Sequence, residues 1–265
     1  TGTAASINTL VGNEGDSGDK VDLDTDYTAT ITDTNLSATV LNNLNSNVPG
    51  LVDATSITNI TGTAAAINTL MGNEGESGNK VNLNTTFTVT VDAGTVAADH
   101  LNTISGKTTG LVTATDASTI TGTAAAINTL VGDEGDSGDK VNLDGDFLVT
   151  IAAGTASAAH LNTINAKTTG LVTATDVSTI TGTAAAINTL IGNEGDAGDK
   201  VNLDGDFLVT IDAGSASAAH LNTINAKTTG LVTATAKPHT LRTRCDVYSG
   251  VGAEGDAGEG VRLGG

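Results

Sequence analysis

One decapeptide constrains the fold of this chain more than any other feature. Thr-Gly-Thr-Ala-Ala-Ala-Ile-Asn-Thr-Leu begins at residues 61, 121 and 181, and a copy with Ser6 in place of one Ala begins at residue 1. The four copies are therefore equally spaced along the chain. Regular repetition of this kind is typical of architectures in which each unit packs mainly against its neighbours. We therefore expect a row of similar units rather than one globular core.

The repeat also sets the expected boundaries. We predict a divergent first repeat at 1–60, full repeats at 61–120, 121–180 and 181–240, and a degenerate partial repeat or cap at 241–265. Residues 236–250 depart from the pattern, although residues 251–260 return in register with it. The departing segment is either a cap over the last core layer or the product of a compensated reading-frame error. Because the chain starts on a repeat boundary, we expect it to be a segment of a longer protein.

Residue composition and net charge limit both the kind of core that this chain can form and the kinds of molecule that it is expected to bind. Aromatic residues make up 2% of the chain, Trp is absent and there are 33 Gly, so the expected core consists of thin layers of Ile, Leu, Val and Ala. The net charge of -19 repels the phosphates of nucleic acids and anionic lipids, so we expect neither as a partner. No apolar run reaches the roughly 20 residues that a membrane-spanning helix needs, so no membrane insertion is expected. The single Cys245 allows no disulfide within the chain.

Each repeat contains two related halves, and each half predicts a short helix. Ile127, Leu130 and Val131 are spaced as one face of a helix that Thr123 begins and Gly132 ends. In the second half, residues 157–170 carry a weaker apolar stripe that suits a shorter or tighter helix. We expect Ser157 to cap it. Because such helices are too short to be stable alone, they need tertiary packing.

Strands are predicted after each helix. They lie at 141–143, 147–151, 171–175 and 177–180, and the pair Asp144-Gly145 indicates a turn between the first two. That turn either closes a hairpin or forms the corner of a coil whose strands pair with the next coil. We favour an α/β solenoid with parallel coils of about 30 residues, in which equivalent residues of successive repeats stack in columns. Because helices need 8–10 Å between their axes and strands about 4.8 Å, we expect the helix row to bend the stack.

The strongest site-like feature is a Gly-rich acidic loop that recurs in the third and fourth repeats. Carboxylate oxygens on a flexible loop suit Ca²⁺, which accepts irregular geometry with 6–8 oxygen ligands. The loop distantly resembles the glycine-aspartate nonapeptides of calcium-binding β-rolls, although its spacing differs from theirs. The alternative is a solvated acidic edge that keeps the protein soluble. The candidate ligands are Glu134, Asp136, Asp139, Asp144 and Asp146, with Glu194, Asp196, Asp199, Asp204 and Asp206 in the next repeat.

No residue set predicts an enzyme. The histidines at 100, 160 and 220 have Ala, Leu and Asn as neighbours, so we expect helix-surface positions. Neither a Ser/His/Asp set nor a Gly-x-Ser-x-Gly motif is present. The Thr-rich strands weakly resemble those of ice-binding solenoids, whose flat Thr-x-Thr faces order water.

The array as a whole resembles the repeats of very long surface proteins of aquatic bacteria. The resemblance rests on Thr-Ile-Thr-Gly-Thr-Ala-Ala-Ala-Ile and on Leu-Asn-Thr-Ile-x-x-Lys-Thr-Thr-Gly-Leu-Val-Thr-Ala-Thr, and it covers residues 1–235. Such proteins are described as adhesin-like or motility-associated, which implies an extracellular or cell-surface location, adhesion and calcium. We predict a structural segment of an adhesin or self-assembling filament, with self-association along the solenoid axis and contacts to the cell surface or neighbouring subunits. An ice-binding or glycan-binding module is the alternative.

Overall fold

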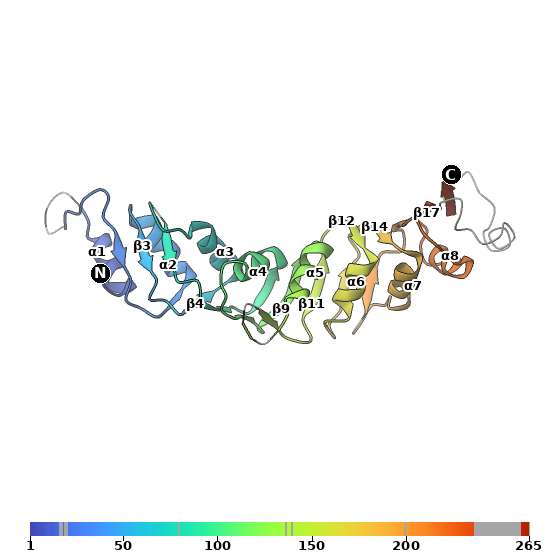
Figure 1. The fold of residues 1–265 in the computed structure, drawn as a ribbon, viewed down its shortest axis with the longest axis horizontal. Coiled ribbons are helices and arrows are strands. Elements are labelled where there is room, and N and C mark those ends of the chain that lie inside the picture. The colour runs from blue at the N-terminus through green and yellow to red at the C-terminus, as the bar shows by residue number, and fades with distance from the viewer. Residues whose placement is uncertain are drawn as a thin grey trace. The chain divides into compact units, whose positions relative to one another are not determined.

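A computed structural model of the chain contains short helices and short parallel strands in regular alternation (Figure 1). It describes residues 1–15, 18, 21–78, 80–135, 137–138, 140–198, 200–235 and 261–264. The segment 236–250, predicted to be a cap or a frame error, lies outside the described residues, as do Cys245 and most of 241–265. The chain divides into two compact units. The first comprises Thr1–Ser118 and Asp133–Asp144, and the second comprises Thr119–Gly132 and Gly145–Gly265.

The described residues of the first unit form four helices and two parallel sheets. Its helices are α1 (Ala4–Gly12), α2 (Ala38–Asn47), α3 (Ala64–Asn73) and α4 (Ala98–Ser105). One sheet has the order β1-β3-β5, and the other has the order β2-β4-β6-β8-β10. The strands are β1 (Ala29–Thr30), β2 (Asn35–Ser37), β3 (Val52–Ala54), β4 (Asn59–Gly62), β5 (Val81–Leu83), β6 (Thr88–Val91), β7 (Gly94–Ala97), β8 (Val112–Ala114) and β10 (Val141–Leu143).

The second unit repeats this arrangement. Its helices are α5 (Ala124–Gly132), α6 (Ala158–Asn165), α7 (Ala184–Gly192) and α8 (Ala218–Asn225). One sheet contains β9-β11-β13-β15, and the other has the order β12-β14-β16-β17-β18. The strands are β9 (Ala117–Gly122), β11 (Leu148–Ile151), β12 (Gly154–Ser157), β13 (Val172–Ala174), β14 (Val177–Gly182), β15 (Val201–Leu203), β16 (Leu208–Ile211), β17 (Val232–Thr235) and β18 (Val261–Gly264).

The helices form where the apolar spacing predicts them. In α5 the predicted face of Ile127, Leu130 and Val131 is fully buried, and the Thr123 hydroxyl accepts the Ala126 N–H at 3.1 Å, as an N-cap does. The second-half helix α6 stops at Asn165, well before Gly170, and is the shorter helix that its weaker stripe indicates. Ser157 occupies its N-cap position but makes no side-chain cap hydrogen bond.

The Asp-Gly turn is a corner and not a hairpin. In the second unit β15 and β16 flank Asp204-Gly205, yet β15 pairs with β13 while β16 pairs with β14 and β17. All ladders recorded between described strands are parallel. The α/β class with parallel pairing is therefore confirmed.

The prediction that equivalent residues of successive repeats stack in columns is wrong for the strands. Val149 pairs with Val172, and Val172 pairs in turn with Val201. Two successive steps from Val149 thus arrive at Val201 and not at Val209, its equivalent in the next repeat. Equivalent strands such as β9 and β14 accordingly belong to different sheets. The helices do keep the sequence period, since α5 and α7 begin at equivalent positions of their repeats, as do α6 and α8.

The mismatch between helix and strand spacing explains this drift. Neighbouring helices pack in sequence order, α6 on α7 and α7 on α8, and need 8–10 Å between their axes (Figure 1). Parallel strands stay only about 4.8 Å apart. A ladder of strands beside such a helix row must therefore run at an angle to the row. Each sheet ends after a few strands, and the next strands along the chain begin a new sheet.

The turns after α4, α6 and α8 are each closed by a buried threonine. Thr168 follows α6, and its hydroxyl donates to the Phe147 carbonyl at 2.6 Å and accepts the Gly170 N–H at 3.0 Å. Thr228 makes the same two bonds, to Phe207 and Gly230. Because donor and acceptor are both used, this polar group costs little to bury.

Candidate functional site: the acidic loops

The acidic loop after each first-half helix is closed at its base by backbone hydrogen bonds. Between α7 and β15, the Gly195 N–H donates to the Val201 carbonyl at 3.2 Å, and the Val201 N–H donates to the Asn193 carbonyl at 3.0 Å. The loop of the second repeat closes in the same way, with Gly75 bonded to Val81 at 3.1 Å. The first and last residues of the loop are therefore held close together.

A lysine lies across the base of the loop in the second, third and fourth repeats. A Cβ atom on Gly195 would come within 3.1 Å of Cγ of Lys200, so the aliphatic part of this lysine occupies the space that the glycine leaves. In the second repeat, Nζ of Lys80 donates to the Gly72 carbonyl in the last turn of α3 at 3.4 Å. A cation is favoured at that end because the helix dipole is negative there. In the second repeat, Lys80 therefore links the base of the loop to the end of the helix.

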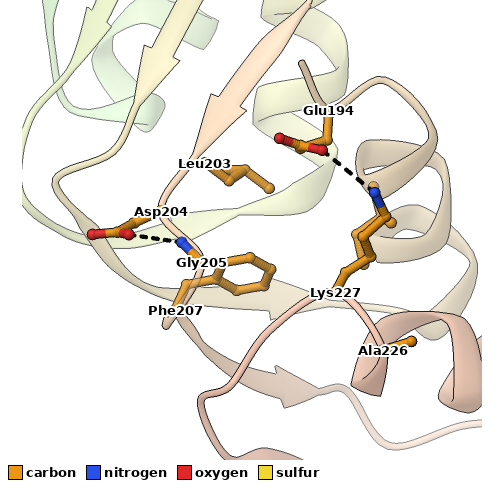
Figure 2. Close-up of a pocket in the computed structure, with 8 residues that line it drawn as sticks. Glu194, Leu203, Asp204, Gly205, Phe207, Ala226 and Lys227 are labelled. Carbon is orange, nitrogen blue, oxygen red and sulfur yellow. Dashed lines mark hydrogen bonds and ion pairs between the residues drawn. The ribbon is translucent and has the colours of Figure 1, made fainter. Parts of the chain in front are cut away.

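In the second and fourth repeats, the glutamate that begins the loop forms an ion pair with a second lysine. Glu194 Oε2 lies 3.5 Å from Nζ of Lys227, which follows α8 (Figure 2). The equivalent pair in the second repeat, Glu74 and Lys107, is 3.6 Å apart. This partnership was missed by sequence reasoning, although one signal was present, because a Lys follows the Glu at the same spacing in the second, third and fourth repeats. In the described geometry the Glu194 carboxylate faces an ammonium group.

The Asp-Gly corner lies near this pair. Asp204 Oδ1 accepts the Gly205 N–H at 2.7 Å, while Asp206 is exposed. Glu194, Asp204, Phe207 and Lys227 are among the residues that line an open hollow of about 240 Å³ (Figure 2). The carboxylates among the lining residues are Glu194 and Asp204, and Glu194 is already paired with Lys227.

The predicted calcium ligands that the structure describes differ in how exposed they are. Glu134 and Glu194 are half-buried, and the exposed candidates are Asp144, Asp146, Asp196, Asp204 and Asp206. Asp136, Asp139 and Asp199 lie outside the described residues. Among the residues that are described, no three His, Cys, Asp or Glu side chains form a group that would hold a metal ion. Calcium binding stays a prediction, in which the loop aspartates would supply the oxygen ligands.

The first repeat differs electrostatically at the equivalent position. Tyr27 replaces the buried phenylalanine of the other repeats, and its hydroxyl donates to the Asn47 carbonyl at 2.8 Å. Partial burial, with a smaller contribution from the Glu14 carboxylate, raises the pKa of the Tyr27 phenol above its ordinary value. Both effects favour the neutral phenol, which keeps this hydrogen bond.

The histidines offer no site in the described part of the chain. His100, His160 and His220 lie half-exposed in the first turn of their helices, and the His220 N–H donates to the Ser217 cap at 3.1 Å. No helix among the described residues is long and apolar enough to cross a bilayer. No protein-family model, curated protein or solved structure matches this chain.

Proposed function

We propose that this chain is an α/β solenoid of 60-residue repeats that serves as a structural segment of an extracellular adhesin or surface filament. The observation that carries the proposal is that successive turns of the chain pair through parallel ladders, beside helices that pack in sequence order. In such an architecture each added repeat buries its apolar face on the last one, so length is gained without a new core.

The acidic loops support a role at the surface. The turn of the chain that contains the threonine-closed corner runs from Val149 to its ladder partner Val172, and the longer turn that contains the acidic loop runs from Val172 to Val201. The additional residues of the longer turn are not needed to complete the ladder, and the loop that contains them carries carboxylates into solvent. We propose that they keep the array soluble and bind calcium, which would stabilise the folded state.

Inserting repeats tests the structural role. One and two additional copies of residues 121–180, placed after residue 180, are expected to raise the maximum dimension in small-angle X-ray scattering by equal steps. Each copy brings two helices at 8–10 Å, so a step of about 16–20 Å is expected. Growth in all three dimensions, with a much smaller step, would contradict the solenoid.

Thermal unfolding tests the calcium role on the full chain. The melting temperature is expected to rise with added calcium and to fall back with excess chelator. Replacing both Asp204 and Asp206 by Asn should reduce this rise, whereas the matched control Asp212→Asn, an exposed position at the end of β16, should not. A melting temperature that does not change with added calcium would contradict calcium binding and would favour the solvated acidic edge.

Rows of threonine favour one alternative. Thr181, Thr210 and Thr233 are ladder partners on three neighbouring strands, and Thr121, Thr150 and Thr173 form a second row. Regular hydroxyl rows are what an ice-binding surface needs. Ice-crystal shaping by the full chain, lost when Thr210 is replaced by Lys, would favour a binding module over a spacer.

A further inference from the structure

The Asp-Gly corner of the fourth repeat brings a carboxyl group against the backbone nitrogen of the next residue. Asp204 and Gly205 lie between β15 and β16, and both are exposed. Oδ1 of Asp204 accepts the Gly205 N–H at 2.7 Å (Figure 2). A Cβ atom on Gly205 would have nothing but its chain neighbours within 4 Å, so the space beside this nitrogen is open. The carboxyl group and water therefore both reach the peptide bond that follows Asp204.

The first two repeats have a threonine where the fourth has this glycine. In the first repeat, Oδ1 of Asp24 accepts the Thr25 N–H at 2.8 Å, which is nearly the same contact. In the second, Asn84 precedes Thr85, and its Oδ1 accepts the N–H of Thr86 at 2.9 Å. A β-branched side chain is stiff and crowds the nitrogen of its own residue, whereas glycine has no side chain. The first and fourth repeats therefore differ in how accessible the nitrogen is, and not in the contact that it makes.

We propose that Asp204 is a site of spontaneous isoaspartate formation, and that Asp144, which is exposed and precedes Gly145, is a second. Rotation of the exposed carboxyl group about its Cβ–Cγ bond turns Cγ toward the Gly205 nitrogen. The nitrogen attacks Cγ, so that an N–Cγ bond forms and a Cγ–O bond breaks. One carboxyl oxygen leaves as water, together with the carboxyl proton and the amide proton. The product is a cyclic succinimide.

Hydrolysis of the succinimide completes the reaction. Water adds to either ring carbonyl carbon, and the bond from that carbon to the nitrogen breaks. Attack at Cγ restores aspartate, whereas attack at the main-chain carbon leaves the chain running through the side chain of residue 204. One water molecule is released and one is taken up, so no oxidant, cofactor or enzyme is needed. The reaction requires only this corner and is independent of the function proposed above.

Isoaspartate at residue 204 loosens the corner. It adds one methylene group to the main chain between β15 and β16, whose ladders run to β13 and β14. The Gly205 carbonyl accepts the Thr229 N–H at 2.9 Å, and the next contact along, from the Thr228 hydroxyl to the Phe207 carbonyl, is 2.6 Å. Because the inserted group directly precedes Gly205, we expect the hydrogen bond between Gly205 and Thr229 to open first.

Incubation in water labelled with a heavy oxygen isotope tests the modification on the full, folded chain. Each ring opening leaves one heavy oxygen atom in the chain, which peptide mapping by mass spectrometry locates, and methylation by an isoaspartyl methyltransferase marks the isoaspartate product. We expect both signals at Asp144 and Asp204 and neither at Asp24. Equal uptake at Asp24 and Asp204 would overturn the proposal. Uptake at Asp204 only after the chain is unfolded in urea would overturn it as well.

Exchanging the second residue of the corner provides matched variants. Gly205→Thr reproduces the corner of the first repeat, and it should abolish uptake at Asp204 while uptake at Asp144 continues. Thr25→Gly should create uptake at Asp24. Unchanged uptake at Asp204 in the Gly205→Thr variant would show that the glycine does not make this corner reactive, and the proposal would fail.

Amide hydrogen exchange measures the effect on the corner. After incubation, the Thr229 N–H should exchange faster in the isoaspartate-containing fraction than in fresh protein. The matched control is the Thr109 N–H, which donates to the Thr85 carbonyl at 2.9 Å in the second repeat and should keep its exchange rate. An unchanged rate at Thr229 in chains that contain isoaspartate would contradict the loosening of the corner.

Discussion

The turn after α6 and the turn after α7 have the same place in their half-repeats but are closed by different interactions. Both connect a helix to a short strand, and the two strands, β13 and β15, are ladder partners. After α6 the chain turns through Lys167-Thr168-Thr169-Gly170 with a buried hydroxyl at its centre. After α7 it makes an acidic loop that is closed only at its base.

The turn after α6 is fixed by close packing. The acidic loop after α7 is less tightly packed, so its residues can vary with function. A Cβ atom on Gly170 would lie 2.4 Å from the Phe147 carbonyl oxygen and 2.5 Å from that of Asp146, so only glycine fits. Gly192, the last residue of α7 before the acidic loop, has nothing within 4 Å of such an atom. An added methyl group should therefore be costly at Gly170 and mild at Gly192.

The largest effect is expected from Gly170→Ala. Because the added methyl group collides with two backbone oxygens, the turn must move, and we expect the free energy of unfolding to fall by about 3 kcal/mol. Urea denaturation followed by circular dichroism measures it. The matched control is Gly192→Ala at the end of α7, which should change stability by less than about 1 kcal/mol. Equal losses in both variants would abolish the distinction between the turns.

A smaller loss is expected from Thr168→Val. The change keeps the shape of the side chain but leaves the Phe147 carbonyl and the Gly170 N–H without their shared hydroxyl, which should cost about 1–2 kcal/mol. Thr169→Val, at the exposed neighbouring position, is the control and should cost less than about 0.5 kcal/mol. If the two variants unfold at the same urea concentration, the buried hydroxyl does not hold the turn.

The first repeat shows how this turn can be closed without a buried hydroxyl. Val48 stands at the position of Thr168 and is fully buried, and there the Gly50 N–H donates directly to the Tyr27 carbonyl at 3.1 Å. A direct bond thus replaces the bridge. A crystal structure of Thr168→Val should show the Gly170 N–H bonded to Phe147 in this way.

The smallest effect is expected from Lys227→Ala, which removes the partner of Glu194. The lysine side chain is 50% exposed and the glutamate 31%, so the pair should contribute only about 0.5 kcal/mol and should weaken with salt. A double-mutant cycle with Glu194→Gln isolates that contribution. A coupling energy above about 2 kcal/mol would place this contact among the fixed parts of the repeat.

Local patterns predicted most helices and strands correctly. The spacing of Ile127, Leu130 and Val131 gave the helix, and Val141-Asn142-Leu143 matched β10 residue by residue. The sequence did not predict that ladder partners would stand at non-equivalent positions of successive repeats. That outcome depends on the length of each turn of the chain, and this length depends on how each corner closes. The candidate calcium ligands stay a prediction. The pairing of Glu194 with Lys227 was not predicted, because it depends on the packing of consecutive half-repeats.

The sequence by itself determined the period, the helix faces and the acidic surface, because these follow from residue types at fixed spacings. Tertiary structure alone decided which β-prone segments become strands. Gly154–Ser157 and residues 214–217 differ only at Thr155 and Ser215, yet the first is a strand beside β14 and the second is not a strand. A strand is stabilised by hydrogen bonds to a neighbour. A strand therefore forms where the fold brings a partner strand beside it, as it brings β14 beside β12.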